Sequence, residues 1–215
     1  MVRVKICGIT SREDAQKAAN LGAWALGFIF HKKSPRFIAP ARAKKIIQDL
    51  PPFVTPVGVF VNHPGGAIRD IISHCGLRVV QLHGDEDPHY CHRLRRYNVK
   101  IIKAFRVDDQ FDFKKVLDYH VDAYLFDTHS DEAYGGTGKT FNWHLLHEFK
   151  STNKPFIVSG GLNPQNVIEV VNTLKPYAVD ASSGLEEEPG KKSHSKLKEF
   201  IEIVHYISGP AVKES

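Results

Sequence analysis

The sequence has few cysteines and no long apolar run, and both absences narrow the class of protein. Its three cysteines, Cys7, Cys75 and Cys91, are too few, and odd in number, for the disulfide framework of a secreted protein. A reducing compartment fits them better, so we expect a cytoplasmic location. No apolar stretch approaches the roughly 20 residues of a membrane-spanning helix, and residues 1–10 lack the parts of a signal peptide. We therefore expect no membrane partner.

The patterns that mark metal or nucleic-acid binding are also missing. Although the chain has 12 histidines, no His-x₃-His or Cys-x₂-Cys pair stands at zinc-ligand spacing, so we expect scattered surface histidines and no metal site. The net charge of +5 fits small anionic substrates as well as nucleic acid. The densest basic cluster, Arg93, Arg95 and Arg96, lacks the interleaved aromatic residues that stack on bases. We therefore expect no nucleic-acid partner.

What the sequence does contain is a regular alternation of short apolar runs and amphipathic segments. Hydrophobic residues make up 42% of the 215 residues and charged residues 25%, which is ordinary globular composition. Short β-branched runs bounded by Gly, Pro, Asn or Asp are typical of buried parallel strands. The expected strands are Val2–Cys7, Ala25–Phe30, Thr55–Phe60, Val79–Leu82, Ile101–Phe105, Ala123–Asp127, Phe156–Ser159 and Tyr177–Ala181.

The segments between these runs have helical patterns. They are Ser11–Leu21, Pro40–Leu50, Pro64–Cys75, Asp87–Tyr97, Phe111–Tyr119, Asn142–Lys150, Pro164–Thr173 and Ser193–Ile207, and Pro40 and Pro164 suit first-turn positions. Eight strand–helix units favour a closed barrel over a doubly wound sheet, which usually has fewer strands. We therefore expect an α/β protein with a single (β/α)₈ TIM barrel over residues 1–215, in which only residues 186–192 form a polar loop.

Small residues follow three consecutive expected strands near the end of the chain. Glycine lets backbone amides approach an anion closely, and serine hydroxyls add donors. Loops after strands seven and eight form the recurring phosphate site of such barrels. The alternative is that these glycines only make tight turns, but three such loops favour phosphate binding. The candidate phosphate-binding residues are Gly136, Gly138, Gly160, Gly161, Asp180, Ser182 and Ser183.

Two further residues at strand ends form a candidate acid–base pair. Cys7 ends the first strand, where it is either an inert core thiol or a base at the barrel rim. Asp127 ends the sixth strand, where it either caps the next loop or acts as a general acid. Because active sites of these barrels lie at the C-terminal strand ends, the two would face each other across the mouth. Acid–base isomerisation is the reaction that needs fewest other groups.

Arg36 and His83 are the remaining candidates for substrate binding. Arg36 lies in Ser34-Pro35-Arg36-Phe37, where its guanidinium can hold a carboxylate bidentately or remain a solvated surface group. His83, in Gln81-Leu82-His83-Gly84, either contacts the substrate or only its neighbours.

Taken in chain order, the motifs resemble those of one enzyme family, the phosphoribosylanthranilate isomerases. The similar segments are Lys5-Ile6-Cys7-Gly8-Ile9-Thr10, Ser34-Pro35-Arg36, Gly58-Val59-Phe60-Val61-Asn62, Val80-Gln81-Leu82-His83-Gly84-Asp85-Glu86, Gly135-Gly136-Thr137-Gly138, Ser159-Gly160-Gly161-Leu162 and residues 179–186. They run from the first strand to the eighth. The sequence departs from the family pattern at Phe37, where tyrosine is common, and at Asn142, where aspartate is common.

The resemblance implies a substrate, a reaction and a role for each residue. The family converts N-(5-phosphoribosyl)anthranilate to 1-(2-carboxyphenylamino)-1-deoxyribulose 5-phosphate by an Amadori rearrangement, without a cofactor. By this pattern Cys7 is the general base, Asp127 the general acid, and Arg36 the group that holds the anthranilate carboxylate. The glycine and serine loops match the phosphate site. Members of the family are monomers or homodimers.

Two other functions stay open from the sequence. Another aldose–ketose isomerase, such as the aminoimidazole isomerase of histidine biosynthesis, would show two half-barrels and paired catalytic aspartates. Here Cys7 takes the first-strand position and no repeat is evident. A phosphate-binding protein without catalysis would not need both Cys7 and Asp127.

Overall fold

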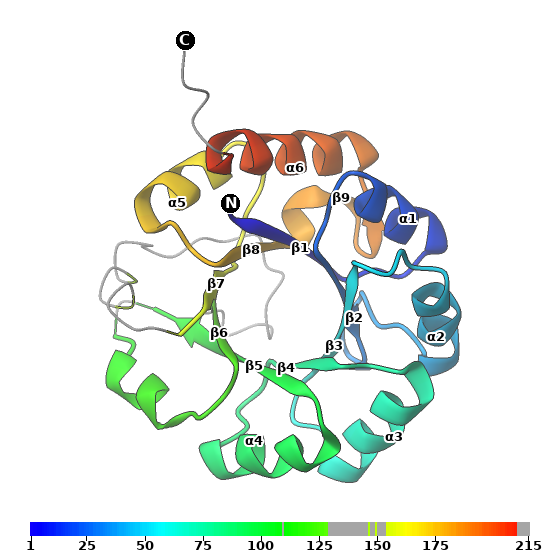
Figure 1. Cartoon of the computed structure of the whole chain (residues 1–215), viewed down its shortest axis with the longest axis vertical. Coiled ribbons are helices and arrows are strands. Elements are labelled where there is room, and N and C mark those ends of the chain that lie inside the picture. The colour runs from blue at the N-terminus through cyan, green and yellow to red at the C-terminus, as the bar shows by residue number, and fades with distance from the viewer. Residues whose placement is uncertain (109, 129–145, 147–148, 150–153, 210–215) are drawn as a thin grey trace.

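The computed structural model describes residues 1–108, 110–128, 146, 149 and 154–209. Its main strands are β1 (Arg3–Cys7), β2 (Ala25–Ile29), β3 (Thr55–Phe60), β4 (Val79–Leu82), β5 (Lys100–Val107), β6 (Ala123–Thr128), β7 (Phe156–Val158) and β8 (Ala178–Ala181). They pair in parallel and in chain order, and β8 pairs with β1 to close a barrel. Figure 1 shows this ring with the helices outside it. The expected (β/α)₈ barrel is confirmed, and the doubly wound sheet is ruled out.

The helices follow the expected order. They are α1 (Arg12–Asn20), α2 (Pro40–Gln48), α3 (Gly65–Cys75), α4 (Pro88–Leu94), α5 (Val167–Leu174) and α6 (His194–Ser208), with short 3₁₀ segments η1 (Arg95–Tyr97), η2 (Phe113–Asp118) and η4 (Ser183–Leu185). Their starts have local causes. The Ser11 hydroxyl accepts a hydrogen bond from the Asp14 amide at 3.1 Å, and Pro40 is the first residue of α2, where its missing N–H has no helical partner to lose.

Two helix expectations need correction. The segment expected as a helix over residues 111–119 is the 3₁₀ turn η2, which begins where the Asp112 carboxylate accepts the Lys114 amide. Pro164 does not begin α5, because the Asn163 side chain accepts the amides of Gln165 and Asn166 and forms a separate turn first. The helix expected over residues 142–150 lies almost wholly outside the described residues.

The expectation of a polar loop at residues 186–192 also needs correction. It forms a small antiparallel hairpin of β9 (Glu186–Glu188) and β10 (Lys191–Lys192). Glu186 and Lys192 are both buried and form an ion pair of 2.8 Å. An entirely polar segment gives no hydropathy signal for burial, so the sequence did not predict that its ends turn inward.

The strands divide the core into two layers because successive side chains point to opposite faces. One face packs beneath the helices and forms the main hydrophobic cluster. The other face points into the barrel, where a smaller cluster fills the space below the mouth: Val57, Ile102, Ala104, Ala123, Leu125, Ile157 and Ala178. Along most of these inward rows the side chains become polar toward the C-terminal strand ends, although Ile29, Val59 and Val61 line the cavity at the ends of β2 and β3. The fold therefore gathers polar groups at one mouth.

Candidate active site

A cavity opens at the C-terminal ends of the strands. It encloses about 670 Å³, including the space open to solvent at its mouth. Its wall includes every candidate site residue that the structure describes: Cys7, Arg36, His83, Asp127, Gly160, Gly161, Asp180, Ser182 and Ser183. Gly136 and Gly138 lie outside the described residues. The predicted gathering of Cys7, His83, Asp127 and Ser183 at one mouth is thus observed.

Cys7 points into this cavity from the last residue of β1. Opposite it on β2 stands Gly27, and a Cβ there would lie only 2.6 Å from the Cys7 sulfur. Gly27 therefore leaves the space that the thiol occupies. Burial raises the pKa of the Cys7 thiol, and Asp180 adds to the rise, whereas Lys5 and Lys192 oppose it. The ionisation of Cys7 depends on the charges around it.

Asp127 faces His83 across the cavity. The distance from Asp127 Oδ2 to His83 Nε2 is 3.1 Å, and both side chains are buried. The other ring nitrogen, Nδ1, lies 2.7 Å from the Gln81 amide nitrogen. When that amide donates to Nδ1, the ring proton sits on Nε2 and faces Asp127. The Nε2 atom is buried and makes no hydrogen bond among the described residues, so its contact with Asp127 is a matter of distance and not of a formed hydrogen bond.

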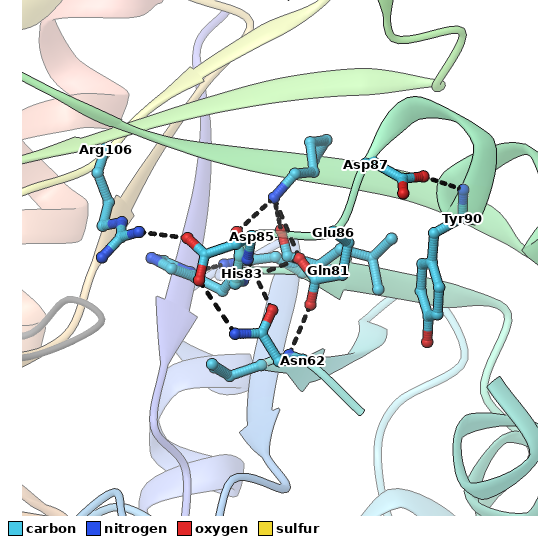
Figure 2. Close-up of polar contacts among 12 residues, drawn as sticks. Asn62, Gln81, His83, Asp85, Glu86, Asp87, Tyr90 and Arg106 are labelled. Atoms are coloured by element: carbon cyan, nitrogen blue, oxygen red, sulfur yellow. Dashed lines mark hydrogen bonds and ion pairs between the residues drawn. The ribbon is translucent and has the colours of Figure 1, made fainter. Parts of the chain in front are cut away.

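The loop after β4 carries His83, and its neighbours hold that loop firmly (Figure 2). The Glu86 carboxylate accepts the backbone amides of Asn62 and Gly84 at 2.8 and 2.9 Å. Lys103 forms a buried ion pair with Glu86 at 3.1 Å and donates to the Gly84 carbonyl at 2.7 Å. These contacts fix the backbone that follows His83.

A second set of contacts holds the same loop nearer to solvent. The Asn62 side chain donates to Asp85 at 3.1 Å and accepts the Asp85 amide at 2.7 Å, and Arg106 forms an ion pair with Asp85 (Figure 2). A Cβ on Gly84 would lie 2.2 Å from the Asn62 side-chain oxygen, so only glycine fits there. The loops after β3, β4 and β5 are thereby joined beside the cavity.

Arg36 is buried at the opposite side of the cavity and is paired with Glu186. Its Nε lies 2.9 and 3.0 Å from the two carboxylate oxygens, and its Nη2 lies 2.7 Å from Oε2. Lys192 donates to the same carboxylate at 2.8 Å. Burial tends to raise the pKa of Glu186, but the hydrogen bond from Arg36 and the charge of Lys192 outweigh it and lower that pKa. One edge of the guanidinium is therefore occupied, and the Nη1 edge remains to meet a ligand.

The two glycine and serine loops form the third part of the wall. Gly160 and Gly161 have φ of 91° and 64°, which L-residues adopt only with strain. The side chains of Asn163 and Asn166 both donate to the Gly161 carbonyl, at 3.2 and 3.0 Å. These two bonds fix the Gly161 carbonyl and with it the backbone of the turn that lines the cavity. Gly184, in the loop after β8, lies so close to the loop after β7 that a Cβ on it would be 2.2 Å from the Leu162 carbonyl oxygen.

No group of three or more His, Cys, Asp and Glu side chains that could hold a metal ion is found among the described residues. In the same part of the chain, no helix has the length and apolarity to cross a membrane.

Comparison with known proteins identifies the family. The model of N-(5'-phosphoribosyl)anthranilate isomerases matches residues 4–203. The chain belongs to this family. It is 51% identical to the N-(5'-phosphoribosyl)anthranilate isomerase of Geobacter sulfurreducens, over 94% of this chain and 97% of that protein. As a phosphoribosylanthranilate isomerase it is an enzyme of tryptophan biosynthesis.

Solved structures of phosphoribosylanthranilate isomerases have the same fold. The Thermotoga maritima enzyme superimposes with a TM-score of 0.89 at 42% identity, covering 98% of this chain and 100% of that one. Another, with a TM-score of 0.87 and 41% identity over 96% of this chain and 100% of that one, was solved with reduced 1-(o-carboxyphenylamino)-1-deoxyribulose 5-phosphate. A further structure contains monomers generated from the dimeric T. maritima enzyme.

Sequence reasoning missed the groups that surround the site residues. Glu186 holds Arg36 and is itself bound by Lys192, and Asn163 and Asn166 hold the Gly161 turn. Lys5 was another signal that could have been used, because it is a charged residue inside an otherwise apolar strand, two positions before Cys7.

Proposed function

We propose that this chain converts N-(5-phosphoribosyl)anthranilate to 1-(2-carboxyphenylamino)-1-deoxyribulose 5-phosphate by an acid–base Amadori rearrangement. The observation that carries the proposal is that one cavity holds Cys7 and Asp127 together with Arg36 and the glycine and serine loops. These are the groups that a substrate with both a carboxylate and a phosphate requires. A family member at 41% identity was solved with the reduced form of this product.

The two ends of the substrate define its orientation. The phosphate is placed against the turns of Gly160–Gly161 and Ser182–Ser183, where backbone amides and hydroxyls supply donors; Gly136 and Gly138 belong to the same proposal. The anthranilate carboxylate is placed at the free edge of Arg36, since a planar guanidinium matches a carboxylate. The Oδ1 atom of Asp180 is buried without a hydrogen-bond partner among the described residues, and we assign it to a sugar hydroxyl.

In the first step Asp127 is the general acid. It gives its proton to the furanose oxygen while the C1'–O bond breaks, and the nitrogen lone pair forms a C=N bond. The ring-opened product is a protonated Schiff base. Asp127 is left as a carboxylate, which His83 stabilises from 3.1 Å through its Nε2 proton.

In the second step Cys7 is the general base. Its thiolate removes the proton from C2', and the electron pair moves toward the cationic nitrogen to give an enolamine. The enolamine becomes the ketone when C1' takes up a proton and the C2' hydroxyl loses one. Because the Schiff base serves as the electron sink, the residues need no metal or other cofactor for this route.

The test is replacement of each group while the rest of the site is kept. Cys7→Ser supplies a hydroxyl that does not ionise in the working range, and Asp127→Asn is nearly isosteric but donates no acid proton. Each should lower kcat by about 10²–10⁴-fold, with substrate binding mostly retained. Turnover is followed by the loss of anthranilate fluorescence.

The controls separate the competing functions. Near-normal turnover in either variant would refute the assigned roles. A protein that binds phosphate without catalysis would show no fluorescence loss even in the wild-type form, and an aminoimidazole isomerase would act on its own substrate instead. Activity should survive exhaustive chelation, and its loss there would show that a metal is required.

We further propose that residues 1–215 form one catalytic domain, which acts in the cytoplasm as a monomer or homodimer without nucleic-acid or membrane partners. The support is the single closed barrel, the free thiols of all three cysteines, and the monomeric and dimeric forms of a relative. Light scattering at several concentrations distinguishes the two assembly states.

A further inference from the structure

A buried lysine lies beneath Cys7 inside the barrel. Lys5 precedes Cys7 by two residues on β1, so the alternation of the strand turns both side chains inward. Lys5 is only 3% exposed. Its Nζ lies 2.6 Å from Asp180 Oδ2, on the neighbouring strand β8, where the two residues are register partners. The Lys5 charge lowers the pKa of the Cys7 thiol, as expected for two inward side chains two residues apart on one strand.

We propose that Lys5 is a positioning residue that stabilises the thiolate form of Cys7 when it ionises, and that Asp180 weakens this effect because it shares the same ammonium. The inference rests on the proposed function, which makes Cys7 the base. It adds an acid–base balance set by two strands: β1 supplies the thiol and the cation, and β8 supplies the competing carboxylate.

The charges that face Cys7 support this division of roles. Burial raises the pKa of the thiol most strongly, Lys5 is the largest effect that lowers it, Asp180 raises it, and Lys192 lowers it more weakly. Lys192 is already bound to Glu186 at 2.8 Å and to the Ser182 carbonyl at 3.2 Å. Lys5 is therefore a better candidate than Lys192 for the counter-ion of a Cys7 thiolate.

The other charged groups around the cavity have partners of their own. Arg36 is bound to Glu186 on the hairpin, and His83 stands against Asp127 at 3.1 Å from β4 and β6. None of them is among the leading influences on the pKa of Cys7. The balance at the thiol is thus set chiefly by Lys5 and Asp180.

Lys5 stays protonated in this environment. Burial alone would lower the pKa of Lys5, but Asp180 and Cys7 outweigh burial and raise it. Burial also raises the pKa of Asp180, against the opposing effect of Lys5. The pair is charged, because 2.6 Å is the separation of a charge-assisted hydrogen bond.

A purely structural ion pair and a thiolate counter-ion predict opposite patterns. If the pair only supported the barrel, Lys5→Met and Asp180→Asn would each break it and affect Cys7 alike. If Lys5 is the counter-ion, Lys5→Met removes the cation, whereas Asp180→Asn frees it for Cys7. The two variants should then move the ionisation of Cys7 in opposite directions.

The experiment is a pH titration of the Cys7 thiolate by its ultraviolet absorbance. Each variant is measured as a difference from the same variant carrying Cys7→Ser, so that tyrosines, Cys75 and Cys91 cancel. We expect Lys5→Met to move the midpoint of the Cys7 titration to higher pH, which lowers the thiolate fraction at a given pH by about tenfold or more, and Asp180→Asn to move it to lower pH. Lys100→Met is the control, since Lys100 forms an exposed ion pair with Asp122 at the start of β5; it should leave the titration unchanged.

A second comparison covers the case in which Lys5→Met fails to fold around an unpaired Asp180. The double variant Lys5→Met/Asp180→Asn buries no lone charge of the pair, and it should have a lower thiolate fraction than Asp180→Asn alone. An unchanged titration on loss of Lys5, or shifts of equal sign in the two single variants, would overturn the proposal.

Kinetics distinguish this inference from the proposed function. In Lys5→Met the acid limb of kcat/KM should move to higher pH, and turnover should recover as pH rises. If Cys7→Ser remains active while the titrations behave as expected, Cys7 is not the general base, but Lys5 and Asp180 still control its ionisation. If Cys7→Ser is inactive and the titrations do not move, Cys7 is the general base and the proposed role of Lys5 is wrong.

Discussion

The guanidinium of Arg36 has two edges, one bound to Glu186 and one left for the carboxylate of the proposed substrate. The edge formed by Nε and Nη2 is bound to Glu186, whose carboxylate is held in turn by Lys192. The expected bidentate grip on a ligand therefore cannot use that edge. Glu186 instead fixes the plane of the guanidinium, so that the remaining edge is oriented before the substrate arrives. Pre-orientation of this kind reduces the ordering that binding requires.

Variants of Arg36 and Glu186 should accordingly affect binding in the same direction. Arg36→Lys keeps the charge but loses the planar group, and Glu186→Gln keeps the shape but removes the charge that holds it. We expect each to lower kcat/KM by about tenfold to a hundredfold, mainly through KM, in the fluorescence assay. Arg69→Lys is the control, because Arg69 forms an exposed pair with Asp70. A normal KM in both variants would show that Arg36 does not meet the substrate.

Gly27 is a single residue whose lack of a side chain serves the site. Alanine there would place a Cβ 2.6 Å from the Cys7 sulfur and 3.1 Å from the Cys7 Cα, so the thiol must shift. Since small displacements of a reacting group are expensive in rate, Gly27→Ala should lower kcat by about tenfold to a hundredfold. Gly66→Ala, in helix α3 with nothing within 4 Å of its Cβ, should keep full activity. Equal activity of the two variants would mean that Cys7 has room to spare.

At the scale of elements, the barrel strands were predictable because each is a short apolar run. The same period-2 pattern turns Cys7, Asp127 and Asp180 to the inner face, so their common mouth followed from strand order alone. The hairpin of residues 186–192 was not predictable, since its burial depends on an ion pair within it and on another with Arg36, far away in the chain. The late start of α5 was missed for a related reason, because Asn163 competes for the amides of the first turn.

The loops after β7 and β8 are positioned against each other by one close contact. A Cβ on Gly184 would lie 2.2 Å from the Leu162 carbonyl oxygen and 3.0 Å from the Asn163 Cβ, and backbone cannot yield as a flexible side chain does. Gly184→Ala should push the loops apart and weaken the phosphate site. We expect KM for the substrate and the inhibition constant for inorganic phosphate to rise together, by about tenfold. A rise in only one of them would show that the phosphate binds elsewhere.

At the scale of the whole molecule, stability and function share the same buried charges. Lys5–Asp180 ties the first strand to the last, where the barrel closes, and Glu186 ties the hairpin to the loop after β2. Breaking a buried pair from one side leaves an uncompensated charge, which destabilises strongly. Substitutions in these groups must therefore be measured for unfolding as well as for activity.

The dependence of stability on pH should report Glu186 in particular. Burial tends to raise its pKa, but Arg36 and Lys192 lower it below the ordinary value of 4.5. A carboxyl group with a depressed folded pKa stabilises the fold fully above its unfolded pKa and loses that contribution as pH falls through the folded value. The difference in unfolding free energy between wild type and Glu186→Gln, from urea titrations, should thus be constant near neutrality and shrink below about pH 4.5.

A difference that stays constant down to acid unfolding would mean that Glu186 keeps no lowered pKa, and the ion pairs around Arg36 would then contribute nothing to the fold.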